Sequence, residues 1–390
     1  MPDRLEIRTL KRENAKFLSL APEVKHEDEP AAEVTRRSPS SSVKEQLDSL
    51  EVLVDFKLDL MPEDFELKDL VIMEHFPDSM SGQVSLAQHA ASGVLMARRV
   101  IDVSHNSKNH DAIKKELQIM RDCSSQFLVQ CYGAFYDRNF TEGKISICME
   151  LMDLGSLAYI SRNCGPVRID VLGKIAEAVL GAITYLYSNF KIMHRNLKPS
   201  KILLNSLGQI KLSDFRASGE LINSIAETVV WSKTCYMAPE RILGESYTIK
   251  SEVWSFGLTI IELAIGKFPY HFAPDPDDIT GEGVKIHDVL ERITRDPAPR
   301  LPESDAFPDI LHQMIEKCMQ SDPANRSNPV ELYDEDRFIQ AGKRTPVDLT
   351  AWLASSHIAA AIASAIASAF RRLLSPSHNT RYRVRHDNSL

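Results

Sequence analysis

Cysteine is scarce in this sequence, and no two cysteines form a C-x-x-C pair. The chain has six cysteines in 390 residues, scattered between Cys123 and Cys318. Zinc sites and disulfide frameworks need cysteines at short, regular spacings, so neither is predicted. This usage is typical of a reducing compartment, and we expect a cytoplasmic location.

An excess of basic charge and an apolar N-terminal segment are also missing. The formal net charge is −8, and no stretch of the body of the chain concentrates Lys and Arg. A nucleic-acid partner is therefore not expected, and a protein or small-molecule partner is favoured. Residues 1–4 are charged where a signal peptide requires an apolar core, so secretion is not expected.

The hydrophobic content, in contrast, is high enough for a large core. With 390 residues, 43% of them hydrophobic, we expect a two-lobed unit of roughly 250–300 residues plus tails. Residues 1–42 are rich in charge and serine and are predicted to be a disordered tail. Residues 43–60 are predicted to form an amphipathic helix, because Ser42 and Glu45 match a capping box and apolar residues up to Phe56 recur every three or four positions.

The pattern of apolar residues changes near residue 157. Before it, apolar runs and alternation predict one helix at 112–121 and strands at 68–73, 83–89, 94–102, 129–135 and 144–151. After it, helical periodicity predicts helices at 167–187, 250–265, 286–295 and 307–319. We therefore expect an α+β fold with a sheet lobe, a helical lobe and a cleft between them.

Four short segments carry specific motifs. Residues 194–201 read H-R-N-L-K-P-S-K, 237–240 read M-A-P-E, 254–257 read W-S-F-G, and 150–156 read E-L-M-D-L-G-S. They resemble the catalytic loop, the A-P-E motif, the helix after it and the hinge of protein kinases. The resemblance implies a two-lobed protein-kinase fold over residues 62–340. It also implies that Met149 is the gatekeeper and that Arg326 pairs with Glu240.

Within the kinases, five more segments resemble the MAP kinase kinases: 93–99, 132–136, 145–150, 191–194 and 218–222. The resemblance covers about residues 62–355 and implies a MAP kinase and an upstream MAP kinase kinase kinase as partners, with a kinase heterodimer as a further option. Residues 11–20 weakly resemble the motif that docks a MAP kinase, the alternative being a solvated basic cluster. Residues 345–356 resemble the segment that docks the upstream kinase.

The resemblance further implies a site for ATP and magnesium. Its cofactor-binding positions are Gly82, Val84, Ala97, Arg99, Glu116, Met149, Met152, Lys201 and Leu203. Asn196, Lys198 and Asp214 occupy catalytic positions, and Asp214 is also a metal-ligand position. Ser224 and Thr228 stand at the spacing of the two phosphorylated residues of the activation segment.

Several of these positions depart from the kinase pattern. The phosphate-covering loop keeps only Gly82, because Pro77 and Ser79 stand where the first two glycines belong. Arg99 replaces the strand lysine, and we expect it to keep an ion pair with Glu116 while the phosphate contact is misplaced.

The catalytic and metal positions depart as well. Asn196 replaces the catalytic aspartate, and an amide cannot take the substrate proton at neutral pH. Lys201 replaces the metal-binding asparagine, and we expect it to pair with Asp214 in place of the metal. Arg216 replaces the glycine of D-F-G and is predicted to restrict the switch of that segment.

The C-terminal end has its own pattern. Residues 357–374 are rich in Ala and Ser, with an isoleucine or phenylalanine at every fourth position from Ile358 to Phe370, and are predicted to form an amphipathic helix followed by a basic tail at 375–390. A partner-binding or self-docking helix is favoured. Contact with a membrane surface and a tail anchor are the alternatives.

Together the substitutions predict a MAP kinase kinase-like pseudokinase that acts as a scaffold or allosteric partner. The alternative is an active dual-specificity kinase that uses ATP to phosphorylate the activation loop of a MAP kinase. Nucleotide binding without metal, through Lys201, is a third hypothesis.

Overall fold

A computed structural model describes residues 56–57, 65–75, 83–102, 117–137, 144–214, 234–270 and 286–354. The tails at 1–42 and 357–390, the positions Pro77, Ser79 and Gly82, Glu116 and the segment 215–233 lie outside these residues. The predictions made for them therefore stay predictions.

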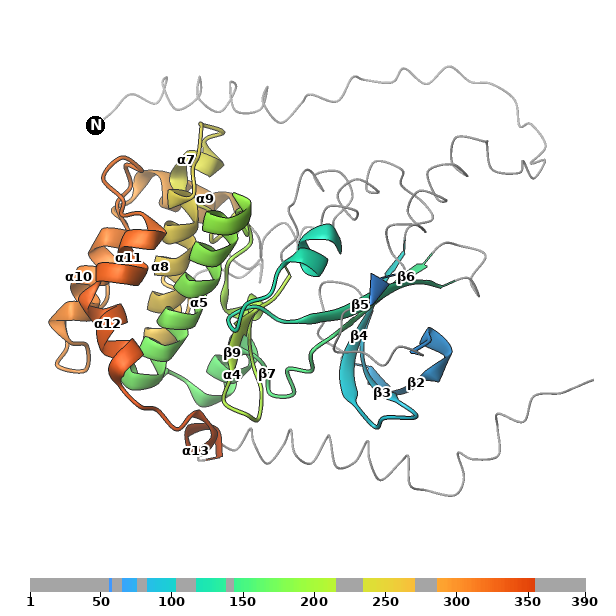
Figure 1. Cartoon of the computed structure of the whole chain (residues 1–390). Helices are drawn as coiled ribbons and strands as arrows, with labels where there is room; N and C mark the ends of the chain where they lie inside the picture. The colour runs from blue at the N-terminus through green and yellow to red at the C-terminus, as the bar shows by residue number, and fades with distance from the viewer. Residues whose placement is uncertain are drawn as a thin grey trace, which may run out of the picture. The chain divides into compact units, whose positions relative to one another are not determined.

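One sheet of six antiparallel strands forms the N-terminal lobe (Figure 1). Its strands are β1 (Phe56–Lys57), β2 (Leu70–His75), β3 (Gln83–His89), β4 (Leu95–Asp102), β5 (Cys131–Asp137) and β6 (Lys144–Met149), in the order β1-β5-β6-β4-β3-β2. A 3-10 turn, η1 (Leu67–Asp69), precedes β2. A small core of Phe65, Ala87, Met96, Phe135 and Cys148 covers one side of this sheet. The described part of the predicted helix at 112–121 is helical over residues 117–122.

Strand β1 corrects the prediction of one helix over 43–60. Phe56 pairs with Ala134 of β5, and Lys57 pairs with Gly133. The free edge of β5 offers backbone hydrogen bonds to the incoming chain, and Phe also favours strands, so pairing in the tertiary structure overrides the helical spacing at this point. The rest of the predicted helix lies outside the described residues.

The C-terminal lobe is mainly helical. Its helices are α4 (Leu157–Cys164), α5 (Ile169–Phe190), α7 (Pro239–Ile242), α8 (Lys250–Ile265), α9 (Ile286–Arg295), α10 (Asp309–Cys318), α11 (Pro329–Glu335), α12 (Arg337–Arg344) and α13 (Leu349–Ala354). A 3-10 turn, η3 (Pro199–Lys201), leads into a small sheet of β7 (Gly155–Ser156), β8 (Ile202–Leu204) and β9 (Ile210–Leu212). This architecture confirms the predicted α+β fold.

Helices α5 and α8 supply the centre of the larger core. Both are hydrophobic around most of their circumference, and Trp254 and Phe256 of α8 are fully buried. Such helices are stable only when other elements cover them, and α10, α11 and α12 pack around them (Figure 1). Gly173 of α5 and Gly342 of α12 let two helix backbones meet, because a Cβ built on Gly342 would lie 2.6 Å from the carbonyl oxygen of Gly173.

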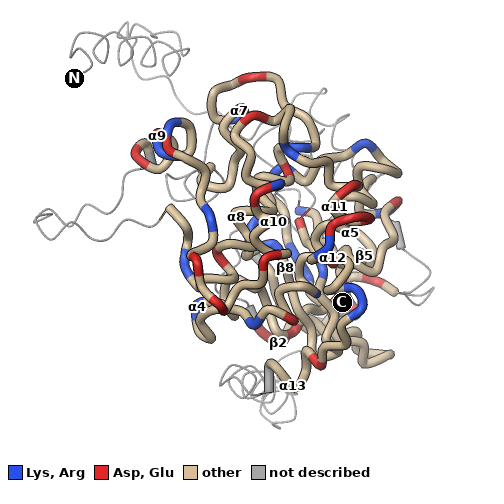
Figure 2. Tube along the Cα trace, turned by 90° about the vertical axis from the view of Figure 1, so that its left-hand side faces the viewer, with Lys and Arg blue, Asp and Glu red and all other residues tan. Residues whose placement is uncertain are grey.

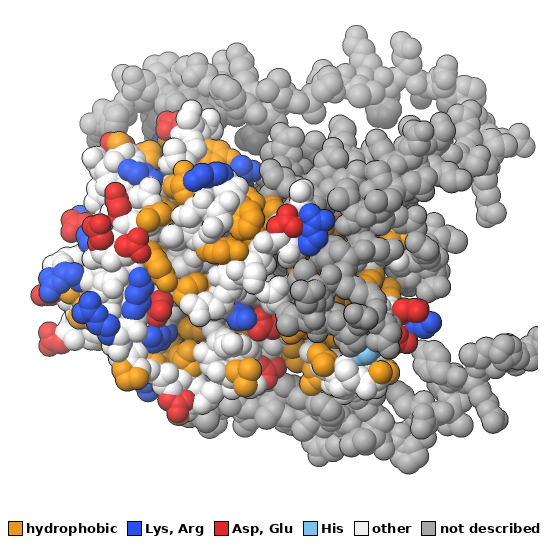
Figure 3. All heavy atoms as spheres, viewed as in Figure 1, with side chains coloured by type: hydrophobic (Ala, Val, Ile, Leu, Met, Phe, Trp, Pro, Cys, Tyr) orange, Lys and Arg blue, Asp and Glu red, His pale blue; other side chains and the backbone are white. Residues whose placement is uncertain are grey.

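The surface carries charges of both signs. Lys and Arg are interspersed with Asp and Glu over the described chain (Figure 2). On the face shown in Figure 3, hydrophobic side chains reach the surface in groups among the charged ones. None of the described helices combines the length and the apolar character that a membrane span requires.

Candidate functional site

The strands place four of the nine predicted nucleotide-binding residues, Val84, Ala97, Arg99 and Met149, in two register pairs that share β4. Register pairs Ala97 of β4 with Met149 at the end of β6, and Val84 of β3 with Arg99 of β4. Residues two apart in a strand share a face, so Ala97 and Arg99 lie on the same face of the sheet. Met152 is buried beyond β6, and Leu203 lies in β8, in the middle of the small sheet.

The catalytic loop is built around a buried histidine. Nε2 of His194 lies 2.9 Å from the carbonyl oxygen of Ser213, and Nδ1 lies 3.3 Å from the backbone nitrogen of Asn196. A carbonyl can only accept and an amide N–H can only donate, so the ring is neutral with its proton on Nε2. Burial also lowers the pKa of His194, against the smaller opposing effect of the hydrogen bond to Ser213.

Helix α8 holds this loop through Glu252. The backbone N–H of Arg195, a residue with a positive φ of 62°, donates to Oε1 of Glu252 at 2.7 Å. Burial raises the pKa of Glu252 to about 6, although the charges of Arg241 and Arg195 act in the opposite direction. The Oε2 atom of Glu252 is buried and has no hydrogen-bond partner among the described residues.

The most informative contacts are those of Asp214. Nζ of Lys201 lies 2.5 Å from Oδ2 of Asp214, and Nη1 of Arg99 lies 3.7 Å from Oδ1. All three side chains are at most 10% exposed. The backbone N–H and Oγ of Ser213 also bind the carbonyl oxygen of Lys201, at 2.9 and 3.0 Å, and tie the two segments together.

These contacts confirm the predicted Lys201–Asp214 pair. The ion pair between Arg99 and Asp214 was not predicted, because the motif assigns the strand cation to Glu116, which lies outside the described residues. The long reach of an arginine was the only signal in the sequence that could have suggested it.

The described residues do not fit a magnesium ion. Magnesium takes oxygen ligands in a near-octahedral arrangement, whereas Lys201 puts an ammonium group against the one carboxylate at this position. Within the described ranges, no group of three or more His, Cys, Asp and Glu side chains is arranged to hold a metal.

The residue at the base position is also unsuited to proton transfer. Oδ1 of Asn196 is buried and accepts no hydrogen bond from the residues described, and an amide is not a base at neutral pH. Lys198, two positions further along the loop, is also buried. Burial raises the pKa of Cys235 to about 12, although the positive charge of Lys198 acts in the opposite direction.

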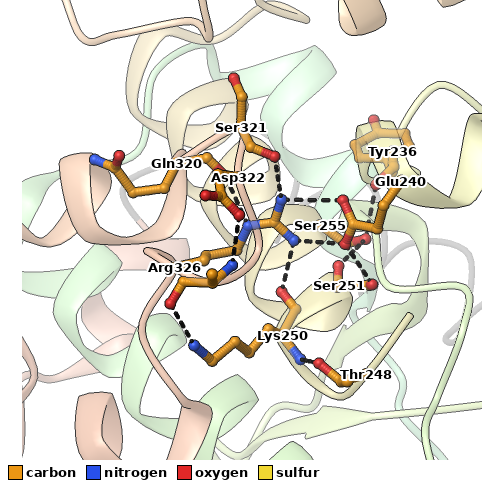
Figure 4. Close-up of polar contacts among 11 residues, drawn as sticks. Tyr236, Glu240, Thr248, Lys250, Ser251, Ser255, Gln320, Ser321, Asp322 and Arg326 are labelled. Atoms are coloured by element: carbon orange, nitrogen blue, oxygen red, sulfur yellow. Dashed lines mark hydrogen bonds and ion pairs between the residues drawn. The ribbon is translucent and has the colours of Figure 1, made fainter. Parts of the chain in front are cut away.

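The helical lobe keeps the A-P-E ion pair. Nη1 and Nη2 of Arg326 lie 2.7 and 3.1 Å from the two carboxylate oxygens of Glu240, and both side chains are buried (Figure 4). Ser251 donates to Glu240 at 2.6 Å, and Arg326 donates further to the carbonyl oxygens of Gln320 and Lys250. The predicted pairing of Arg326 with Glu240 is therefore confirmed. The buried pair connects α7 to the start of α8 and to the segment after α10, and we call this connection the frame of the helical lobe.

Sequence reasoning missed a second buried ion pair next to the hinge. Nζ of Lys211 in β9 lies 2.8 and 2.7 Å from the two carboxylate oxygens of Glu150, which also accepts the backbone N–H of Gln130. The two partners are 61 positions apart, and no spacing rule connects them.

The segment predicted to dock an upstream kinase contains α13. Asp348 caps this helix by accepting the backbone N–H of Ala351 at 2.8 Å. Leu349 is buried, with its Cβ 3.5 Å from the position of a Cβ on Gly208 in the turn between β8 and β9. The helical lobe thus holds the start of this segment, and its docking role stays a prediction.

Fold and motifs together define a protein kinase domain. Residues 79–338 match the family described as the protein kinase domain, so the chain belongs to the protein kinase family. Protein kinases bind ATP together with magnesium.

Two relatives narrow the class. The chain is 47% identical over 386 residues to a mitogen-activated protein kinase kinase, MST7, of Pyricularia oryzae, with 97% of this chain and 90% of the relative covered. It is 36% identical over 358 residues to the dual specificity protein kinase FUZ7 of Mycosarcoma maydis, with 80% of each chain covered. The chain belongs to the MAP kinase kinases.

Proposed function

We propose that this member of the MAP kinase kinases is a pseudokinase, which serves a MAP kinase cascade by binding other kinases. The observation that carries the proposal is the 2.5 Å contact between Nζ of Lys201 and Oδ2 of Asp214. In a protein kinase this aspartate binds the metal that neutralises the transferred phosphate. In this chain the ammonium group of Lys201 takes the place of that metal beside Asp214.

The other altered positions support the same conclusion. Asn196 supplies no base, and Arg99 directs its charge toward Asp214. The frame of the helical lobe is intact, as the buried Arg326–Glu240 pair shows. A kinase fold that keeps the packing of its helical lobe but lacks the residues that bind metal and accept the substrate proton can still bind partner proteins. The partners we propose are a MAP kinase, met through residues 11–20, and an upstream kinase, met through residues 345–356, in the cytoplasm.

The first test is a phosphotransfer assay with the purified full chain, magnesium-ATP and a MAP kinase whose activation loop carries Thr and Tyr. We expect no incorporation. Phosphorylation that is lost in the Asp214→Ala variant would refute the proposal and establish the active dual-specificity kinase.

The second test measures the shift of the melting temperature with ATP, with and without a chelator. No shift, or a shift that the chelator does not change, agrees with the proposal, and the second result indicates metal-independent nucleotide binding. A shift that requires magnesium favours the enzyme. The triple variant Asn196→Asp, Lys201→Asn, Arg216→Gly restores the kinase residues and should gain magnesium dependence if these positions limit metal binding.

A further inference from the structure

Two largely buried ion pairs connect β9 and the segment directly after it to the six-stranded sheet. Lys211, the central residue of β9, binds both carboxylate oxygens of Glu150, the residue that directly follows β6. Two residues beyond β9, Asp214 meets Arg99 of β4 at 3.7 Å. On one side the partners lie in β9 and directly after it; on the other they lie in β4 of the large sheet and directly after β6.

These two ion pairs belong to one closed ring. Strands β4 and β6 are neighbours, and register places Arg99 opposite Ile147, three positions before Glu150. The ring therefore runs from β9 through Asp214 and Arg99 into β4, across to β6, and back through Glu150 and Lys211. A ring constrains rotation of one lobe against the other more strongly than a single contact at the hinge does, because any opening motion must break an ion pair.

The charges of the ring are shielded from solvent. The side chains of Arg99, Lys211, Asp214 and Glu150 are 5%, 9%, 9% and 15% exposed, respectively. Buried pairs are screened by salt much less than exposed ones. Lys201 adds a second cation to Asp214 and fixes the position of this carboxylate relative to η3.

We propose that this ring, which we call the β9 latch, holds the two lobes in one arrangement without nucleotide or metal. In an ordinary kinase, ligands in the site contribute to that arrangement; here the chain's own side chains do so. A partner then meets a preformed surface, and its binding does not depend on ATP. The latch does not require the proposed function, because it also applies to a chain with residual phosphotransfer, so the two proposals fail in different experiments.

The test is hydrogen exchange of the full chain, followed by mass spectrometry. The informative amides lie in and beside the segments that connect the two sheets. Leu154, between β6 and β7, donates to Leu204 of β8, and Glu150, directly after β6, donates to Gln130. Leu212 of β9 donates to Phe127, in the segment that leads into β5. In Arg99→Met we expect exchange at least about tenfold faster at all three, since Asp214 then keeps only Lys201, which lies in the helical lobe, and the connection from Asp214 to β4 is lost. Arg99→Lys keeps the charge and should show a smaller effect.

Two further variants complete the design. Arg121→Met removes an exposed arginine that pairs with its neighbour Asp122 and should leave these amides unchanged. The double variant Glu150→Gln/Lys211→Met removes the other ion pair of the latch without leaving an unpaired charge, and should accelerate exchange at Val129, which lies outside β9 and donates its N–H to Leu212. If Arg99→Met does not fold, the exchange rates of the Glu150→Gln/Lys211→Met variant alone decide whether the latch exists. Acceleration that stays within the strand carrying the substitution would overturn the latch.

Discussion

The stability of the site depends on the ammonium group of Lys201, and replacing it tests the electrostatic account directly. We consider Lys201→Asn, which puts back the residue that kinases use at this position. The substitution removes a cation 2.5 Å from Oδ2 of Asp214 and leaves Arg99 at 3.7 Å from Oδ1. Asp214 therefore loses its nearer positive partner and keeps the more distant one.

The magnitude follows from the two distances. At an effective dielectric constant of about 20, Coulomb's law gives an attraction of about 7 kcal/mol at 2.5 Å and about 4.5 kcal/mol at 3.7 Å. Desolvation of the lysine offsets much of the larger value, and loss of one partner of a buried pair costs about 3–5 kcal/mol. Because Arg99 still compensates Asp214 and the new amide can donate to it, we expect a loss of about 2–3 kcal/mol in the free energy of unfolding.

Urea unfolding at pH 7, with a thermal melt beside it, measures this loss. Lys68→Asn is the matched control, because Lys68 forms an ion pair of similar length, 2.7 Å, with Glu66 at the surface. We expect no measurable change in the control, since exposed pairs contribute little. In the double-mutant cycle of Lys201→Asn with Asp214→Asn, the coupling should reach about 1–3 kcal/mol. A loss no larger than in the control, or a coupling near zero, would refute the reasoning.

Three other predictions concern the frame of the helical lobe. Gly342→Ala places a methyl group 2.6 Å from the carbonyl oxygen of Gly173 and should lower the free energy of unfolding, measured in urea, by about 1–3 kcal/mol. Arg326→Met leaves Glu240 buried without its cation and should cost about 3–5 kcal/mol, with a lower melting temperature in a thermal melt. Because the pKa of Glu252 is raised from 4.5 to about 6, this residue contributes stability below pH 4.5 that is lost as the pH rises through 6. Glu252→Gln should therefore remove up to about 2 kcal/mol of pH dependence in this window, and an unchanged pH profile of stability would contradict the assignment.

Elements with a strong local pattern could be predicted from the sequence to the residue. The predicted strand at 83–89 and the predicted helices at 250–265 and 286–295 coincide with β3, α8 and α9. Alternation and helical periodicity depend on neighbours in the chain, and such neighbours are visible in the sequence. Strand β1 could not be predicted, because its conformation depends on β5, more than 70 positions away.

For the site, the sequence alone determined which side chains are present and which chemistry they lack. An amide at Asn196 is no base, and an ammonium at Lys201 is no metal ligand, whatever the surroundings. The motif spacing was also sufficient to predict that Lys201 meets Asp214. Only the tertiary structure decided that Arg99 forms an ion pair with Asp214 and that Lys211 forms one with Glu150. The physical reason is that an ion pair forms where the backbone brings two charges within a few ångströms, and here strands distant in the sequence supply those charges.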